Sequence, residues 1–219
     1  MTDDAVKATV TFSKEETGLA GKEIPGATIT LKTTTGADLS KVTRKSGPEM
    51  KYDEKTNSVS WTSGSAPLVL EGLRFGEYVM SEIAAPSGYA VATDITFTVE
   101  DDGRIKATGV SAAAVKPEEG LVLMTDDAIK ATVTFSKEET GLAGKEIPGA
   151  KITLKTTTGA DLSKASRKSG PEMKYDEKTN SVTWTSGSEP LILEGLRVGE
   201  YVMSEIGRAS CRERVFRAV

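Results

Sequence analysis

Short runs of alternating apolar and polar residues dominate residues 6–127, and this period of two is the pattern of half-buried β-strands. In the first run Val10 and Phe12 share one face. The other runs are Ala27–Leu31, Met50–Tyr52, Val59–Trp61, Leu68–Leu70, Tyr78–Glu82, Ile95–Val99, Arg104–Lys106 and Leu121–Met124. We expect Lys41–Lys51 to be a solvated loop, and no run of ten or more residues keeps a helical period. The pattern predicts an all-β fold, a β-sandwich of about eight short strands and roughly 120 residues.

The pattern then repeats along the chain. Thr2–Ile83 aligns without a gap to Thr125–Ile206 at a constant offset of 123, and only eight of these 82 positions differ. A period of this length is a whole domain, so the chain is a tandem array of near-identical domains. We expect residues 1–5 to be the end of a preceding repeat or a linker, 6–127 a complete repeat, and 128–206 a second, truncated repeat.

Residues 207–219 break the repeat sharply. They contain four Arg and the only cysteine, Cys211, whereas the preceding 206 residues contain five Arg. A basic tail after a shortened strand is one interpretation. The segment also resembles a translated sequencing-adapter read-through, a contaminant of draft assemblies. We therefore expect 207–219 to be an artefactual tail and exclude it from the fold prediction.

The amino-acid composition excludes several classes of catalytic and metal-binding site. The 219 residues include no His and one Cys, which excludes His-dependent catalysis, internal disulfides and Cys-based metal clusters. A net charge of −4 with both signs interspersed argues against a nucleic-acid partner. No apolar run approaches the roughly 18 residues of a membrane-spanning helix, and no export signal follows Met1. The acidic pairs lack a calcium-loop pattern, so we expect no metal and no cofactor.

Three strands each carry an ionisable residue at the next inward position after two apolar ones. Lys14 follows Val10 and Phe12 in this sense, Glu82 follows Tyr78 and Met80, and Asp126 follows Val122 and Met124. The strands could end there, leaving these side chains at the rim of the sandwich. They could instead form a buried salt-bridge cluster, since buried charges are rare unless paired.

A covalent bond is the third interpretation. Burial disfavours the charged forms of amines and carboxylic acids, so it favours a nucleophilic neutral Lys14 and a protonated Glu82. The Glu82 proton can polarise the Asp126 carboxyl, and attack by Lys14 then releases water and leaves an amide. The fold would supply the proximity that such a condensation lacks in water.

Five segments of the first repeat carry a family resemblance. They are Val10–Lys14, Ile24–Leu31, Leu70–Tyr78, Ser81–Tyr89 and Ile95–Val99, of which the Glu-x-x-Ala-Pro-x-Gly-Tyr element is the most specific. Together they resemble the Cna-B-like (collagen-adhesin B-type) domains of isopeptide-forming pilins and adhesins of Gram-positive bacteria. The resemblance implies tandem prealbumin-like or immunoglobulin-like β-sandwiches in an extracellular protein of the cell wall or surface.

The same resemblance implies residue roles. In this family the first-strand lysine, here Lys14, bonds to an Asn or Asp of the last strand, assisted by the glutamate that Glu82 matches. Asp126 has the right strand parity, and Asp127 is the alternative acceptor. The second repeat keeps Lys137 and Glu205, but its acceptor strand is missing, so we expect an incomplete site that forms no bond.

Two functions follow as expectations. The first is a structural spacer of a pilus or adhesin stalk whose partners are neighbouring repeats and whose only catalysis is single-turnover cross-linking. The second is a module that binds a host glycan or matrix protein through the insertion around residues 44–66. Trp61 and Tyr52 would form its ligand surface, although aromatic residues in a hairpin more often pack in a core. Near-identity of the repeats favours the spacer.

Overall fold

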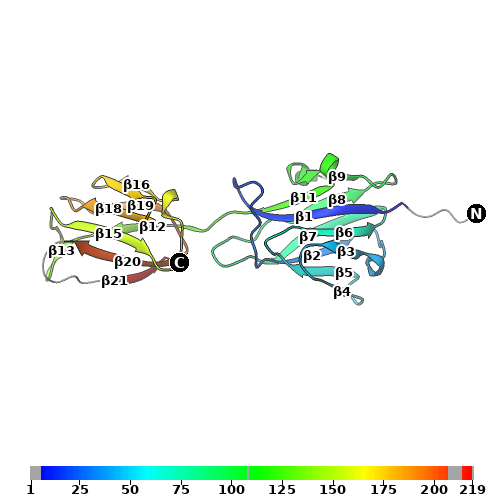
Figure 1. The fold of residues 1–219 in the computed structure, drawn as a ribbon, viewed down its shortest axis with the longest axis horizontal. Coiled ribbons are helices and arrows are strands. Elements are labelled where there is room, and N and C mark those ends of the chain that lie inside the picture. The colour runs from blue at the N-terminus through cyan, green and yellow to red at the C-terminus, as the bar shows by residue number, and fades with distance from the viewer. Residues whose placement is uncertain (1–5, 108, 207–213, 219) are drawn as a thin grey trace, which may run out of the picture. The chain divides into compact units, whose positions relative to one another are not determined.

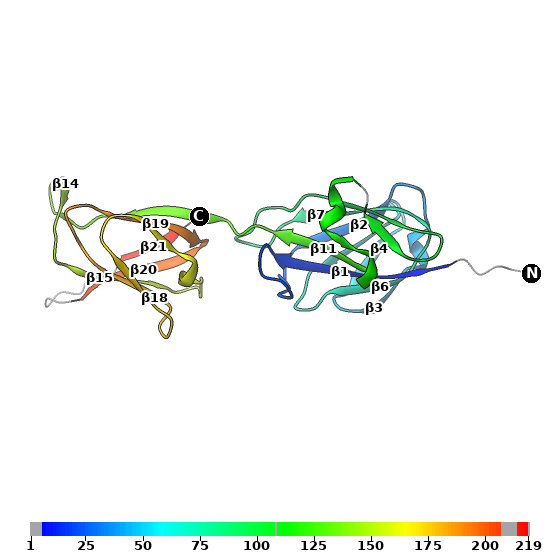
Figure 2. The same ribbon diagram turned by 90° about the horizontal axis from the view of Figure 1, so that it is seen from above.

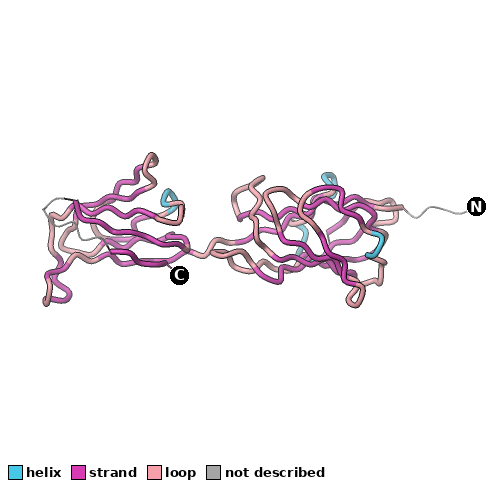
Figure 3. Tube along the Cα trace, turned by 60° about the horizontal axis from the view of Figure 1, so that its bottom comes forward, coloured by secondary structure: helices cyan, strands magenta, loops and turns pink. Residues whose placement is uncertain are grey.

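The computed structural model describes residues 6–107, 109–206 and 214–218. The chain divides into two compact units, Met1–Ala128 and Ile129–Val219. Strands make up most of both units, and the helical segments are 3₁₀ turns of three to five residues (Figure 3). The predicted all-β class is therefore confirmed. In the described part of the chain, no helix is long and apolar enough to cross a membrane.

The first unit contains two packed sheets (Figure 1). The five-stranded sheet has the order β10-β11-β1-β6-β3, with bounds β1 Ala8–Glu16, β3 Thr43–Ser46, β6 Leu68–Leu73, β10 Val115–Lys116 and β11 Leu121–Asp126. The six-stranded sheet has the order β4-β5-β2-β7-β8-β9, with bounds β2 Thr28–Thr33, β4 Met50–Asp53, β5 Ser58–Thr62, β7 Gly76–Ala84, β8 Ile95–Val99 and β9 Ile105–Ala107. The 3₁₀ segments are η1 Leu39–Lys41, η2 Gly109–Ala113 and η3 Pro117–Glu119.

The first and last long strands of this unit, β1 and β11, lie side by side and run parallel (Figure 2). Their register places Phe12 opposite Val122 and Glu16 opposite Asp126. The other pairings in this sheet are antiparallel. Two strands separated by most of the domain's sequence are therefore hydrogen-bonded neighbours at the centre of one sheet.

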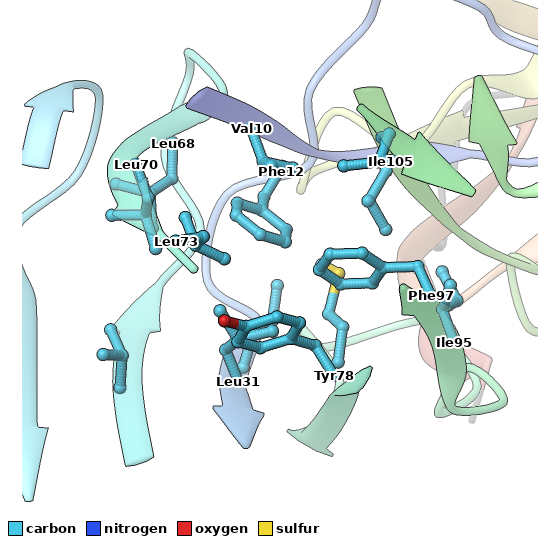
Figure 4. Close-up of a cluster of buried hydrophobic side chains, with 14 of the residues drawn as sticks. Val10, Phe12, Leu31, Leu68, Leu70, Leu73, Tyr78, Ile95, Phe97 and Ile105 are labelled. Atoms are coloured by element: carbon cyan, nitrogen blue, oxygen red, sulfur yellow. The ribbon is translucent and has the colours of Figure 1, made fainter. Parts of the chain in front are cut away.

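Inward-facing side chains of both sheets form the core, with three aromatic rings near its centre (Figure 4). The Phe12 and Phe97 ring centroids are 5.9 Å apart, and the Tyr78 ring stacks on Phe97 at 5.4 Å. The Tyr78 hydroxyl donates a hydrogen bond to the Arg74 carbonyl oxygen at 2.7 Å. Burial raises the pKa of Tyr78 to about 12, so this phenol stays protonated in the folded domain.

One predicted loop contains a strand. The stretch Lys41–Lys51 was expected to be a solvated loop, but Thr43–Ser46 within it forms β3, which pairs with β6 at the edge of its sheet. All four residues of β3 are exposed, so the strand has no apolar alternation to reveal it. Backbone pairing with β6 is sufficient at an edge position, where polar and charged side chains are common.

The second unit has the same arrangement of strands as the first over the part of the sequence that repeats, residues 125–206. Its sheets have the orders β12-β19-β16 and β17-β18-β15-β20-β21, and a separate hairpin pairs β13 with β14. The strand bounds are β12 Lys130–Phe135, β13 Glu138–Glu139, β14 Leu142–Glu146, β15 Lys151–Thr156, β16 Ser166–Ser169, β17 Met173–Asp176, β18 Ser181–Thr185, β19 Leu191–Arg197, β20 Gly199–Ile206 and β21 Arg214–Ala218; the 3₁₀ segment η4 is Leu162–Lys164.

Part of the segment that we excluded from the fold prediction forms a strand. β21 pairs with β20 so that Gly199 lies opposite Ala218, as Gly76 of β7 lies opposite Val99 of β8. β21 thus takes the place in the second unit that β8 has in the first. The edge of β20 offers unpaired backbone groups, and a short extended segment can satisfy them whatever its origin. Residues 1–5, 207–213 and 219, to which two of the domain predictions refer, lie outside the described residues.

Candidate cross-link site

Three strands from both sheets bring the three inward ionisable residues together in the first unit. β1 and β11 of one sheet carry Lys14 and Asp126, and β7 of the other sheet carries Glu82. The period-two burial of β7 and β11 continues through Glu82 and Asp126, which are as buried as the apolar residues before them. The alternation that builds the core therefore also directs these polar groups inward.

The three side chains are in direct contact. Lys14 Nζ contacts Asp126 Oδ1 and lies 3.0 Å from Glu82 Oε1. Only 2% of the Lys14 side chain and none of the Asp126 or Glu82 side chain is exposed. The rim position that alternation alone left open is therefore not what the structure shows, whereas the salt-bridge and covalent interpretations both fit this geometry.

A loop over residues 85–94 fixes the glutamate. The Ala92 backbone N–H donates a hydrogen bond of 2.6 Å to Glu82 Oε2, so Oε1 is the oxygen that faces Lys14. The same loop contacts the ends of the other two strands, because the Tyr89 hydroxyl donates to Glu16 Oε2 at 3.0 Å and the Ala90 N–H donates to the Asp127 carbonyl oxygen at 3.0 Å. The three strands that carry Lys14, Glu82 and Asp126 are thus hydrogen-bonded, at or next to their ends, to one loop.

The electrostatics favour a protonated acceptor. Burial raises the pKa of the Asp126 carboxyl above its usual range; Lys14 opposes this effect and Glu82 adds to it. Asp126 Oδ2 is buried and has no hydrogen-bond partner. An ionised carboxylate oxygen without a partner is costly to bury, whereas a carboxylic acid or an amide is much less so. The site therefore favours an uncharged form of Asp126.

The structure distinguishes the two candidate acceptors by position. Asp126 lies beside Lys14 with no side-chain exposure, whereas Asp127 is exposed and contributes its backbone carbonyl to the 85–94 loop. Successive side chains of a strand point to opposite faces, which explains why neighbouring aspartates differ so completely. The geometry brings Asp126, and not Asp127, to the lysine.

Comparison with known proteins finds a family of domains that this unit resembles. The SpaA family of prealbumin-like fold domains matches residues 8–112. Residues 8–112 of the first unit are thus similar to SpaA prealbumin-like fold domains. The matched residues include Lys14 and Glu82 and end before Asp126. The predicted resemblance to a prealbumin-like domain is thereby confirmed.

Solved structures also match the chain, at low sequence identity. The Bacillus anthracis TIE protein matches with a TM-score of 0.55 and 16% identity over 97% of this chain and 32% of that one. The major pilin SpaD of Corynebacterium diphtheriae matches with 0.38 and 15%, over 99% and 65%. The Lactobacillus rhamnosus GG shaft pilin spaA matches with 0.35 and 13%, over 97% and 94%. The chain thus spans about a third of the TIE protein, and no curated protein sequence matches it.

The second unit has two of the three groups of this site. Lys137 Nζ lies 3.0 Å from Glu205 Oε2, the same separation as in the first unit. Here, however, the side chains are 33% and 40% exposed. No described residue of this unit takes the place that β11 and Asp126 have in the first.

The candidate ligand surface of the first unit differs from its expected form. Trp61 is 5% exposed and packs against Phe12, with ring centroids 5.6 Å apart, so it belongs to the core. It lies on the inward face of β5, where period-two alternation places it. Tyr52 is 37% exposed and lies near Asn57. A ligand surface that includes Trp61 is therefore wrong for this fold.

Sequence reasoning missed the groups around the lysine and the glutamate. The Ala92 N–H has no side-chain signature, and only the turn-forming Pro86 and Gly88 indicate an ordered loop there. Glu23, which contacts the Lys14 backbone, lies in a polar stretch that reads as an ordinary turn. Among the described residues, no group of three or more His, Cys, Asp or Glu side chains could hold a metal ion.

Proposed function

We propose that the first unit is a load-bearing structural module of a cell-surface protein of the pilus or adhesin-stalk type. It is stabilised by an amide between Lys14 Nζ and Asp126 Cγ. The observation that carries this proposal is the buried contact of Lys14, Glu82 and Asp126 between the first and last long strands. The prealbumin-like family and the tandem near-identity of the repeats support the structural role.

The reaction is a condensation that needs no cofactor. The neutral Lys14 amine attacks Asp126 Cγ while the Glu82 carboxylic acid donates a hydrogen bond to the Asp126 carbonyl oxygen. A C–N bond forms, and the tetrahedral intermediate loses its hydroxyl together with a proton from the amine. Glu82 relays that proton, so one water leaves and the glutamate is regenerated. Fixed contact between the groups replaces the bimolecular encounter that makes this reaction unfavourable in water.

The position of the bond determines its mechanical effect. Lys14 and Asp126 are 112 residues apart in sequence, but they lie on adjacent parallel strands. Tension that enters along β1 would cross to β11 through the amide, so residues 15–125 would carry no load. For comparison, a disulfide that closes a loop of about 100 residues stabilises by about 4.7 kcal/mol in the chain-entropy model. An amide adds resistance to reducing agents.

Intact mass spectrometry of the full chain tests the proposal. We expect the folded protein to lack one water, about 18 Da, relative to its sequence. Lys14→Ala should restore the full sequence mass of that variant, whereas the matched change Lys137→Ala in the second unit should leave the water loss intact. A full-mass wild-type protein with folded-state circular dichroism would refute the cross-link.

A further inference from the structure

We propose that Glu23 is a positioning residue for the Lys14–Asp126 reaction: its carboxylate holds the Lys14 backbone from the side opposite β11. This inference rests on the cross-link proposed above. Lys14 N–H donates to Glu23 Oε2 at 2.9 Å, and the Lys14 carbonyl oxygen accepts from the Ile24 N–H at 2.7 Å. Residues 23 and 24 thus bind both backbone groups of the reactive lysine.

The need for this contact follows from the strand pairing. Thr11 and Thr17 donate their N–H groups to carbonyl oxygens of the β11 segment, at Gly120 and Asp126. Backbone groups alternate in direction along a strand, so those of Lys14 point away from β11. On that side β6 ends with Leu68 opposite Phe12, and it leaves Lys14 without a ladder partner. The Glu23 carboxylate takes the place of the missing strand.

Further contacts hold Glu23 itself in place. The Ser13 hydroxyl donates to Glu23 Oε1, and the chain segments at Glu15 and Glu23 form an antiparallel bridge. The Gly21 N–H donates to Glu15 Oε2 at 3.0 Å, which ties the intervening turn to β1. Ser13 and Glu15 are both at least nine-tenths buried. The Glu23 carboxylate is therefore held in a hydrogen-bonded network at the end of β1.

The second unit shows that this clamp does not require the acceptor strand. Lys137 N–H donates to Glu146 Oε2 at 2.9 Å, and the Ile147 N–H donates to the Lys137 carbonyl oxygen at 2.6 Å. The Ser136 hydroxyl likewise contacts Glu146. This clamp is present although no described residue of the unit corresponds to β11. We infer that residues 23 and 24 fix the lysine backbone before β11 docks, so that Nζ is in place when Asp126 arrives.

The consequence is kinetic. A lysine side chain has four rotatable carbon–carbon bonds, so the position of its Nζ depends on how firmly its own backbone is fixed. A misplacement of about 1 Å at a reacting centre can reduce a rate by roughly a hundredfold. Loss of the Glu23 contact should therefore slow bond formation, whereas an uncharged residue that keeps the acceptor oxygen should not.

The test follows water loss over time by intact mass in full-length chains made by cell-free synthesis. We expect Glu23→Ala to slow the reaction by about tenfold or more, and Glu23→Gln to stay within about twofold of wild type. The equivalent substitution in the second unit, Glu146→Ala, should leave the rate of water loss unchanged. Leu39→Ala, a core change remote from the lysine, controls for a general loss of stability and should react at nearly the wild-type rate once folded.

The outcomes separate the two proposals. If the wild-type chain loses no water, the cross-link fails and the role of Glu23 fails with it. If the wild type reacts and folded Glu23→Ala reacts equally fast, or Glu23→Gln is as slow as Glu23→Ala, only the positioning role is overturned. Should Glu23→Ala not fold, Ser13→Ala removes the hydroxyl that holds Glu23 and should slow the reaction a few-fold; an unchanged rate would overturn the role.

Discussion

The two units present the same lysine–glutamate pair in two environments. The strand Val-Thr-Phe-Ser-Lys is identical in both, and the ion-pair distance is 3.0 Å in both. Exposure differs: the side chains of Lys14 and Glu82 are 2% and 0% exposed, against 33% and 40% for Lys137 and Glu205. The residues that the two units share are therefore sufficient to pair the lysine with the glutamate. Burial of the pair requires residues that only the first unit has.

The difference identifies what β11 contributes to the first unit. It supplies the Asp126 carboxyl, and it lies along β1 beside Lys14, whose side chain is only 2% exposed in this unit. A solvated ion pair such as that of the second unit contributes little to stability. In the first unit burial and Glu82 raise the pKa of Asp126, and the uncharged carboxyl is the form that condenses with an amine. On this account, the last strand of the sandwich makes the site reactive.

Removal of the Asp126 acceptor should change the first unit more than any other substitution. In Asp126→Ala we expect no water loss and a decrease in the unfolding free energy of the first unit of about 4–5 kcal/mol, the scale of a closed loop of this length. Chemical denaturation monitored by Trp61 and Trp184 fluorescence measures it. The second unit should unfold at the same denaturant concentration in both proteins. An unchanged first transition would show that the strands are not covalently linked.

Removal of the general acid should have the next largest effect. Glu82→Gln keeps the size and one hydrogen-bonding oxygen but cannot relay a proton, so we expect bond formation to slow by roughly a hundredfold or more. The matched change Glu205→Gln in the second unit should leave the rate of water loss unchanged. Time-resolved intact mass of the two variants measures both rates. Equal rates in both would remove Glu82 from the mechanism.

A smaller effect should appear in the pH dependence of the unlinked domain. In Lys14→Ala the Asp126 carboxyl remains, and burial and Glu82 still raise its pKa. A carboxyl whose pKa is raised by folding stabilises the fold below its unfolded pKa, about 3.9, and this contribution is lost as pH rises through the folded value. We expect Lys14→Ala to lose unfolding free energy relative to Lys14→Ala/Asp126→Ala as the pH rises from about 4 to about 8. Urea unfolding of both variants across this range measures the difference, and parallel pH profiles would contradict it.

Much of this site could be predicted because it follows the same period-two rule as the core. Lys14, Glu82 and Asp126 each occupy the next inward position after two apolar residues, and the structure buries all three. The β3 strand could not be predicted in this way, because its side chains are all exposed. The Ala92 N–H and the Glu23 clamp depend on how loops fold back onto strands, which no local pattern records.

The most direct test of the central claim is fragmentation mass spectrometry of a protease digest of the folded full-length chain. We predict a branched peptide in which the β1 fragment is joined through Lys14 to the β11 fragment at Asp126, with the mass of both less one water, about 18 Da. Lys137 should appear in an ordinary linear peptide of the same digest. Recovery of Lys14 and Asp126 in separate unmodified peptides would contradict the account.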